Sequence, residues 1–251
     1  MEGDLAGLIK SRQNDMALGM VASIYRQLVN GLKHIHANGY FHRRIEPEHI
    51  LTSAPARVKY RSMDVSSATL VEDATVEVRI SGFGRVRKRN STEPSGASVS
   101  KTTWYRAPEV LVGSTSLSAS VDMWAVGLIL IELVTLKPAF KGDSNANQLM
   151  KIVEVLGGLA RTVNDSDVDE RGKVEGGGEW VEGLRLGTAA GLLTTDPKAP
   201  PKPLRNLFQR RVPDSLIYCV ADLLRYDPEK RVTAEQCTDH PYWIDTRDLT
   251  A

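Results

Sequence analysis

Apolar residues recur at intervals of three and four along much of this chain, and this spacing predicts a mainly helical protein. The longest stripe predicts an amphipathic helix that runs to about Asn38 and ends at Gly39. Asn14 or Asp15 is expected to cap its start. Its apolar positions are Met20, Ile24, Leu28, Leu32 and Ile35. Residues 120–135 are hydrophobic almost all round, so we expect them to form the helix at the centre of the core.

Weaker patterns predict the remaining elements. Thr233 and Gln236 have the spacing of a capping box, which indicates a last helix that begins at Thr233. The other expected helices are short or amphipathic and lie near residues 5–9, 110–112, 145–156 and 214–226. Short strands are expected near residues 58–60 and 76–80.

Three polar stretches separate these elements. Residues 54–77 are predicted to be a loop that contains one short strand, and residues 85–103 to be a mobile surface segment. Residues 157–203 are predicted to be an irregular, partly disordered insertion. Its expected anchors are Trp180, Leu184 and Leu186. We therefore expect one folded unit over residues 1–245, followed by a short tail at residues 246–251.

Composition excludes several classes of protein. The chain has 251 residues, of which 41% are hydrophobic and 25% are charged, as is ordinary for a globular protein. Its formal net charge of +1 provides no overall field that would attract nucleic acid or an anionic membrane. The longest apolar run, residues 123–134, is interrupted by Glu132 and is too short to cross a bilayer. We therefore expect neither nucleic acid nor a membrane as a partner.

The cysteines and the N-terminal residues indicate the compartment. Cys219 and Cys237 are the two cysteines of the chain, and both lie in expected helices. Two thiols without a disulfide framework are typical of a reducing compartment, and a bridge between them is the alternative. The first residues lack the basic and apolar regions of a secretory signal. We therefore expect the protein in the cytoplasm or the nucleus.

Six motifs, in the order found in protein kinases, carry a resemblance to that superfamily. They lie at residues 40–51, 81–84, 104–109, 120–127, 227–231 and 240–243. The first resembles the catalytic loop, whose pattern is His-Arg-Asp followed by Asn, and the second resembles the Asp-Phe-Gly magnesium loop. The third, Trp-Tyr-Arg-Ala-Pro-Glu, resembles the end of the activation segment in the cyclin-dependent and MAP kinase group (CMGC). The last three resemble the central kinase helix and the C-terminal part of the domain.

Two further features resemble the RCK/MAK-type kinases of that group, which include fungal meiosis-inducing kinases. Residues 1–5 with residues 8–10 resemble the hinge and the first large-lobe helix. Residues 178–183, with Leu204 and Phe208, also resemble that subgroup. The resemblance implies a mainly α, protein-kinase-like C-terminal lobe with a few short strands. The Gly-rich loop, strand lysine and helix glutamate of a small lobe would precede the first residue, so the small lobe is expected to be absent.

The positions that carry catalysis in the family hold different residues in this chain. Arg44 stands at the catalytic Asp, Glu46 at the Lys and His49 at the Asn of the catalytic loop. Gly82 stands at the Asp of the magnesium loop. A guanidinium group cannot accept a proton, and loss of a general base alone typically costs a factor of about 10²–10⁴ in rate.

The same substitutions remove the ligands for the family's cofactors. Gly82 offers magnesium no oxygen, and the imidazole of His49 is a poor ligand for an ion that prefers oxygen. The family uses ATP and magnesium, but we expect no cofactor or metal for this chain and no intact catalytic residue. A purely structural interpretation is that Arg44 and Glu46 form an ion pair with each other.

Residues that support the fold in the family are retained. They are His42, Arg43, Phe83, Glu109, Asp122 and Arg231. The resemblance implies that Glu109 and Arg231 form a buried ion pair, and that Asp122 supports the backbone of the catalytic loop. Breaking such a pair typically costs about 3–5 kcal/mol, because it leaves a charge buried without a partner.

The activation lip of the subgroup carries a Thr-x-Tyr pair. Counting back from Trp104 places Ala97, Ser98 and Val99 at those positions, so we expect regulation through this pair to be lost. The neighbouring hydroxyl residues are interpreted as part of a solvated loop, with phosphorylation as the alternative. They are Ser91, Thr92, Ser95, Ser98 and Ser100.

Three hypotheses follow for function. The first is a truncated, catalytically inactive pseudokinase that acts by binding other proteins, whose identity the residues do not indicate. The second is a fragment of an active serine/threonine protein kinase whose true product is longer. The third is a decayed duplicate without a role. The missing catalytic residues favour the first, and with it a protein that is not an enzyme.

Overall fold

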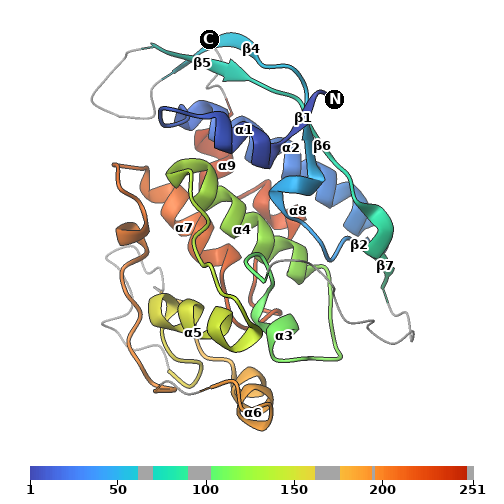
Figure 1. Ribbon diagram of the computed structural model, residues 1–251, viewed down its shortest axis with the longest axis vertical. Coiled ribbons are helices and arrows are strands. Elements are labelled where there is room, and N and C mark those ends of the chain that lie inside the picture. The colour runs from blue at the N-terminus through green and yellow to red at the C-terminus, as the bar shows by residue number, and fades with distance from the viewer. Residues whose placement is uncertain (62–69, 90–102, 162–175, 194–195, 248–251) are drawn as a thin grey trace.

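The computed structural model describes five segments of the chain, residues 1–61, 70–89, 103–161, 176–193 and 196–247. Figure 1 shows helices grouped around one long central helix, with short strands along one side. The α-helices are α1 (Leu5–Ser11), α2 (Leu18–Ala37), α3 (Pro108–Leu111), α4 (Ser120–Thr135), α5 (Asn145–Leu156), α6 (Val181–Ala189), α7 (Asp214–Leu223), α8 (Ala234–Cys237) and α9 (Pro241–Asp245).

The described strands are two to six residues long and form small antiparallel sheets. They are β1 (Gly3–Asp4), β2 (Tyr40–Phe41), β3 (Ile50–Thr52), β4 (Ala56–Arg61), β5 (Leu70–Thr75), β6 (Val78–Ile80) and β7 (Arg87–Lys88). One sheet has the order β1-β3-β6, while β2 pairs with β7 and β4 pairs with β5. Short 3₁₀ turns lie at Pro47–His49, Phe83–Arg85 and Leu204–Leu207.

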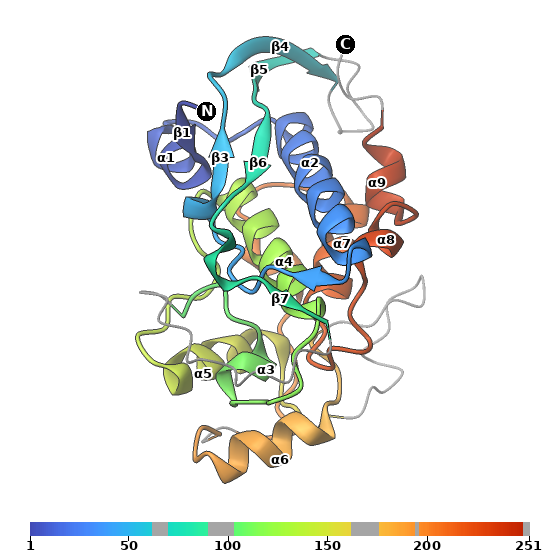
Figure 2. The same ribbon diagram turned by 90° about the vertical axis from the view of Figure 1, so that its right-hand side faces the viewer.

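Helix α4 is the centre of the core. Every residue from Val121 to Val134 is buried, including the carboxylates of Asp122 and Glu132. The helix packs against both α2 and α7, as Figure 2 shows from the side. A helix that is apolar all round is stable only when neighbours cover it on every side, so α4 fixes where the other elements lie. Its bounds confirm the helix expected at residues 120–135.

Helix α2 also occurs where its apolar stripe predicts, but its start is capped differently. It ends at Ala37, and Gly39 follows with a φ of +79°, as expected for a residue just past a helix. The expected caps, Asn14 and Asp15, are wrong. Instead Ala17 begins the helix, and its N–H donates to Asp73 Oδ2 at 2.7 Å.

Two paired strands lie within the polar stretch at residues 54–77, which corrects the predicted loop with one strand. Residues 62–69 of that stretch lie outside the described segments. Strands β4 and β5 pair along their whole length, and Tyr60 of β4 is buried against α2. A Cβ built at Gly19 of α2 would come within 2.4 Å of the Tyr60 ring, so only glycine permits this packing. Asp73 of β5 ties the hairpin to Arg12 at 2.8 Å as well as to Ala17.

Asp73→Ala is expected to lower the free energy of unfolding by about 2 kcal/mol, because it removes a helix cap and an ion pair together. Urea denaturation measures the loss. Asp15→Ala is the matched control and is expected to change stability by less than about 0.5 kcal/mol, since that side chain is largely exposed. Equal losses in the two variants would show that Asp73 does not cap α2.

In the C-terminal part, the structure confirms two predicted features and corrects a third. Helix α5 has the expected bounds, and Thr233 with Gln236 forms the predicted capping box at α8. The irregular insertion predicted at residues 157–203 instead contains α6, and Trp180 before it is buried. The rest of that prediction falls partly on residues 162–175 and 194–195, outside the described segments.

Candidate functional site: the degenerate catalytic loop

The stretch at residues 40–51 runs from β2 into β3 and is held in place by α4. Asp122 of α4 accepts hydrogen bonds from the backbone N–H groups of His42 and Arg43, each at 2.7 Å. The Nε2 of His36 lies 2.9 Å from the same carboxylate. Arg43 adopts a left-handed backbone conformation with φ of +68°, which these two bonds maintain. The buried carboxylate therefore fixes the shape of the loop.

The His42 side chain connects this loop to the second motif. The ring is fully buried, and its Nε2 lies 2.8 Å from the carbonyl oxygen of Ser81. It also makes an edge-to-face contact with Phe83, with ring centroids 5.2 Å apart. Burial lowers the pKa of His42, although Asp122 acts in the opposite direction. A neutral imidazole that bridges two loops has a structural role.

The lowered pKa of His42 predicts a loss of stability in acid. The folded state resists protonation, whereas the unfolded chain accepts a proton near the usual histidine pKa of about 6.5. The contribution to stability is therefore present above about pH 6.5 and falls as the pH drops below it. We expect denaturation midpoints measured from about pH 7 to about pH 5 to fall less in His42→Gln than in the wild type.

Tyr60→Phe serves as the control for that pH series, because it removes one hydrogen bond to Ala74 without changing a group that titrates in this range. It is expected to retain the wild-type slope of stability against pH. Parallel slopes in His42→Gln and the wild type would assign the acid sensitivity to other groups.

Arg44, Glu46 and His49 are bonded to one another at the centre of the loop. Arg44 Nε donates to Glu46 Oε1 at 2.8 Å, and His49 Nδ1 lies 3.1 Å from the same oxygen. Glu46 is 7% exposed, so its carboxylate is largely removed from water. Glu46 is thus the shared partner of Arg44 and His49, and the pairing of Arg44 with Glu46 corresponds to the structural interpretation of the sequence.

The ring of His49 lies over Gly82. A Cβ built at Gly82 would stand 2.6 Å from His49 Cδ2 and 2.8 Å from Cγ, well inside van der Waals contact. Gly82 also has a φ of +80°, a conformation that residues with a Cβ rarely adopt. The volume that a side chain at position 82 would need is therefore filled by the imidazole.

These residues do not fit a magnesium ion. Magnesium requires oxygen ligands in a near-octahedral arrangement, and neither Gly82 nor His49 supplies one. Glu46 is the nearest carboxylate in the cluster, but it is engaged by Arg44 and His49. Within the described segments, no group of three or more His, Cys, Asp or Glu residues is arranged to hold a metal.

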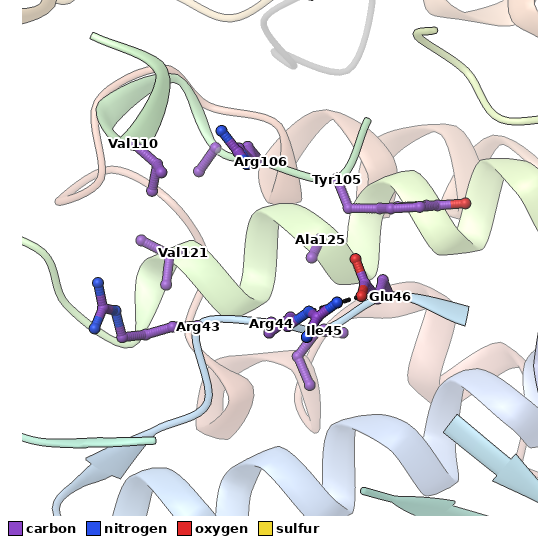
Figure 3. A pocket seen from close by; sticks show the side chains of 10 residues that line it. Arg43, Arg44, Ile45, Glu46, Tyr105, Arg106, Val110, Val121 and Ala125 are labelled. Atoms are coloured by element: carbon purple, nitrogen blue, oxygen red, sulfur yellow. Dashed lines mark hydrogen bonds and ion pairs between the residues drawn. The ribbon is translucent and has the colours of Figure 1, made fainter. Parts of the chain in front are cut away.

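The charges around the loop also disfavour a cation. Burial, and then the neighbouring guanidinium groups of Arg87 and Arg85, lower the pKa of Arg43. These like charges make this side of the loop electropositive. Figure 3 shows a pocket beside Arg43 with Arg44 turned toward Glu46 and with Val121 and Ala125 of α4 in its wall. Its volume of about 40 Å³ has room for a few water molecules.

Two of the other retained residues, Glu109 and Arg231, lie in the core. Arg231 forms a two-point ion pair with Glu109 of α3, at 2.7 and 3.0 Å, and both side chains are almost fully buried. Arg231 also donates to the carbonyl oxygens of Ser120, Arg225 and Tyr226. Phe83 differs from these residues because it is 52% exposed.

One partly buried pair was not expected from the sequence. Tyr105, in the stretch before α3, donates its hydroxyl proton to Glu132 Oε2 of α4 at 2.5 Å. Burial raises the pKa of Glu132 and of Tyr105. The interruption of the apolar run by Glu132 was the available signal, because a carboxylate on a buried helix needs a partner. The activation-lip positions Ala97, Ser98 and Val99 lie outside the described residues.

Comparison with known proteins identifies relatives across most of the chain. The family model of the protein kinase domain matches residues 1–243. The chain is 35% identical to serine/threonine-protein kinase ICK of mouse and 34% identical to serine/threonine-protein kinase MAK of human, in each case over 97% of this chain. It is 31% identical to the sporulation protein kinase mde3 of fission yeast over 95% of this chain. It spans 32%, 33% and 38% of these three relatives, or about a third of their length. The resemblance to RCK/MAK-type kinases is confirmed.

The comparisons correct the expected fold class. The prediction of a C-terminal lobe without a small lobe is wrong. The protein kinase domain model matches residues 1–243, and the relatives align over the same length. That expectation depended on motifs missing ahead of the first residue, and the place where a sequence begins does not establish what a domain lacks. The mainly helical character is nevertheless seen in the described segments, together with the short strands. No helix among these residues is long and apolar enough to span a membrane.

Proposed function

Because the chain belongs to the protein kinase family, we propose that it is a catalytically inactive member of that family which acts by binding other proteins. The contact between His49 and Gly82 carries the proposal, since it fills the position from which the family's magnesium loop would present a carboxylate. Arg44 stands where the family has its catalytic base, and its guanidinium group is bonded to Glu46. The same loop keeps the buried support of Asp122.

These features support a protein that has lost the residues of catalysis and kept the residues that support the fold. Phosphoryl transfer depends on positioning and on metal-assisted stabilisation of charge, so the loss of base and metal ligands removes its main contributions. The retained Glu109–Arg231 pair preserves the folded shape and leaves surfaces that a partner protein can contact. Free thiols at Cys219 and Cys237 support a place in the cytoplasm or nucleus. ATP and magnesium are the cofactors of the family, and we propose that this chain uses neither.

A phosphotransfer assay tests the proposal. Purified protein is incubated with magnesium, labelled ATP and a generic basic substrate, alongside Gly82→Trp and Arg44→Trp purified in the same way. We expect no incorporation above background in the wild type. Incorporation that is equal in all three proteins would come from a contaminant and would agree with inactivity. Incorporation by the wild type that both blocked variants lose would reject the proposal.

The comparisons favour a second candidate, ATP-dependent phosphotransfer to serine or threonine. The relatives ICK and MAK are named as serine/threonine kinases, and this chain spans only about a third of their length. It would then be part of a longer kinase product. The same assay on the longest product translated from the gene discriminates, because activity there and not in the 251-residue chain would support this candidate. A decayed duplicate without a role is weakened by detection of stable, folded protein in the cell.

A further inference from the structure

The β4–β5 hairpin lies outside the degenerate catalytic loop and packs against α2. Its inner face contains Val58 and Tyr60 of β4, opposite Asp73 and Val71 of β5. Tyr60 is buried on α2, and Asp73 binds both the start of that helix and Arg12, the residue that follows α1. Because these contacts hold one face against the helices, the opposite face and the outer edge of β4 are presented outward. Figures 1 and 2 show the ribbon crossing one end of the molecule, and its strands contact α2.

The outward face of β4 is basic. Alternate residues of a strand point to the same side, which places Arg57, Lys59 and Arg61 together. All three are exposed. Glu72 of β5 pairs with Arg57 at 3.1 Å, and 89% of the Arg57 side chain remains accessible. Three positive charges and one negative charge therefore lie on this face, a local excess that the net charge of +1 for the whole chain does not anticipate.

The outer edge of β4 supplies a second feature. The strand pairs with β5 on one side, and none of the other described strands pairs with it on the other. An edge strand presents unpaired backbone N–H and C=O groups that can bond to an added strand. Basic side chains on such an edge repel a second copy of the same basic strand. They attract an extended segment that carries carboxylates at alternate positions.

We propose that the β4 edge binds an extended acidic segment of a partner protein, which adds a strand to the hairpin and places its carboxylates against Arg57, Lys59 and Arg61. Backbone bonds along the edge provide the pairing, and the basic side chains select acidic over neutral or basic segments. Glu72 in the middle of the face disfavours an anionic lipid surface.

A labelled peptide of alternating Glu and Val residues is the probe, and fluorescence anisotropy measures its binding to the full chain. The test variant carries Arg57→Gln, Lys59→Gln and Arg61→Gln. The matched control carries Arg185→Gln, Lys137→Gln and Lys198→Gln, which removes the same charge elsewhere and also breaks one exposed pair with a glutamate. Lys59→Gln alone is a second test variant in case the triple variant does not fold.

We expect the wild type and the control to bind the acidic peptide equally, and the hairpin variant to bind it about tenfold more weakly. Binding should weaken as salt is raised from about 0.05 to about 0.5 M, because exposed charges are screened. A peptide with Pro in place of alternate Val residues keeps the charge but loses backbone donors, and it should bind poorly. Hydrogen exchange should show protection of residues 56–61 on binding.

Several outcomes would overturn the proposal. They are no binding of the acidic peptide, equal binding by the hairpin variant, equal binding of a Lys-Val peptide, and equal binding of the proline peptide. Binding of phosphatidylserine vesicles without binding of the peptide would assign the basic face to membranes instead.

The inference rests on the protein-binding part of the proposed function and not on the absence of catalysis. Failure of the peptide experiment leaves the assay for phosphate transfer unaffected, and the reverse also holds.

Discussion

Glu109→Ala is expected to lower the free energy of unfolding by about 3–5 kcal/mol, the largest effect of any single change considered. The substitution leaves the Arg231 guanidinium buried with carbonyl oxygens and the Trp124 ring, all uncharged, as its remaining partners. Neutral carbonyl groups cannot balance a full charge in a site that water does not reach. Chemical denaturation of purified protein measures the change.

Two further variants provide a control and test whether the unpaired buried charge causes the loss of stability. Glu182→Ala breaks the exposed pair with Arg185 and should leave the denaturation midpoint almost unchanged. Glu109→Leu combined with Arg231→Met removes both charges and should recover much of the lost stability. If Glu109→Ala behaves like Glu182→Ala, the buried pair does not stabilise the fold.

Gly82→Asp, which places the family's residue in the magnesium loop, is expected to destabilise the protein by about 2–4 kcal/mol rather than to create a metal site. The positive φ at this position contributes strain, and the His49 ring occupies the space of the new Cβ. Adding His49→Ala should relieve the collision and leave the strain. Denaturation with and without magnesium measures both stability and any binding.

Substitutions at two other glycines separate the cost of backbone strain from the cost of the collision with His49. Gly113 has a φ of +74° and no atom within 4 Å of a built Cβ, so Gly113→Asp measures backbone strain alone. Gly84 has neither a positive φ nor a close neighbour, and Gly84→Asp should have little effect. A cost for Gly82→Asp no larger than that for Gly113→Asp would show that His49 does not block the position. Stabilisation of Gly82→Asp by magnesium would show that the site accepts a metal after one change.

Local patterns predicted the elements that are organised by their own residues. Helix α4 has apolar side chains on every face, and α8 begins with a capping box formed by residues three apart, so both follow from sequence alone. The cap of α2 could not be predicted in this way. Asp73 lies 56 residues from Ala17 along the chain, and the polar sequence of β5 gives no sign that it is half of a hairpin.

The same distinction holds for the candidate site. Substitutions at Arg44, His49 and Gly82 are visible in the sequence, and Arg44 lies near enough to Glu46 for their pairing to be anticipated. The position of the His49 ring over Gly82 requires the fold, because β3 and β6 bring these two residues together. The resemblance led to the wrong fold class where it was used to infer that the small lobe is absent. That inference depended on motifs that were not found before the first residue, and their absence there does not describe the fold of the chain.

Titration with ATP, followed by thermal unfolding with and without magnesium, tests most directly whether this site has lost its cofactors. We expect no magnesium-dependent rise in the unfolding temperature at millimolar nucleotide, and the same curve in the presence of a chelator. A ligand at about 100 times its Kd would stabilise the folded state by about 2.7 kcal/mol, which such a titration resolves readily. A saturable rise that requires both ATP and magnesium would contradict the claim that His49 and Arg44 have closed the site.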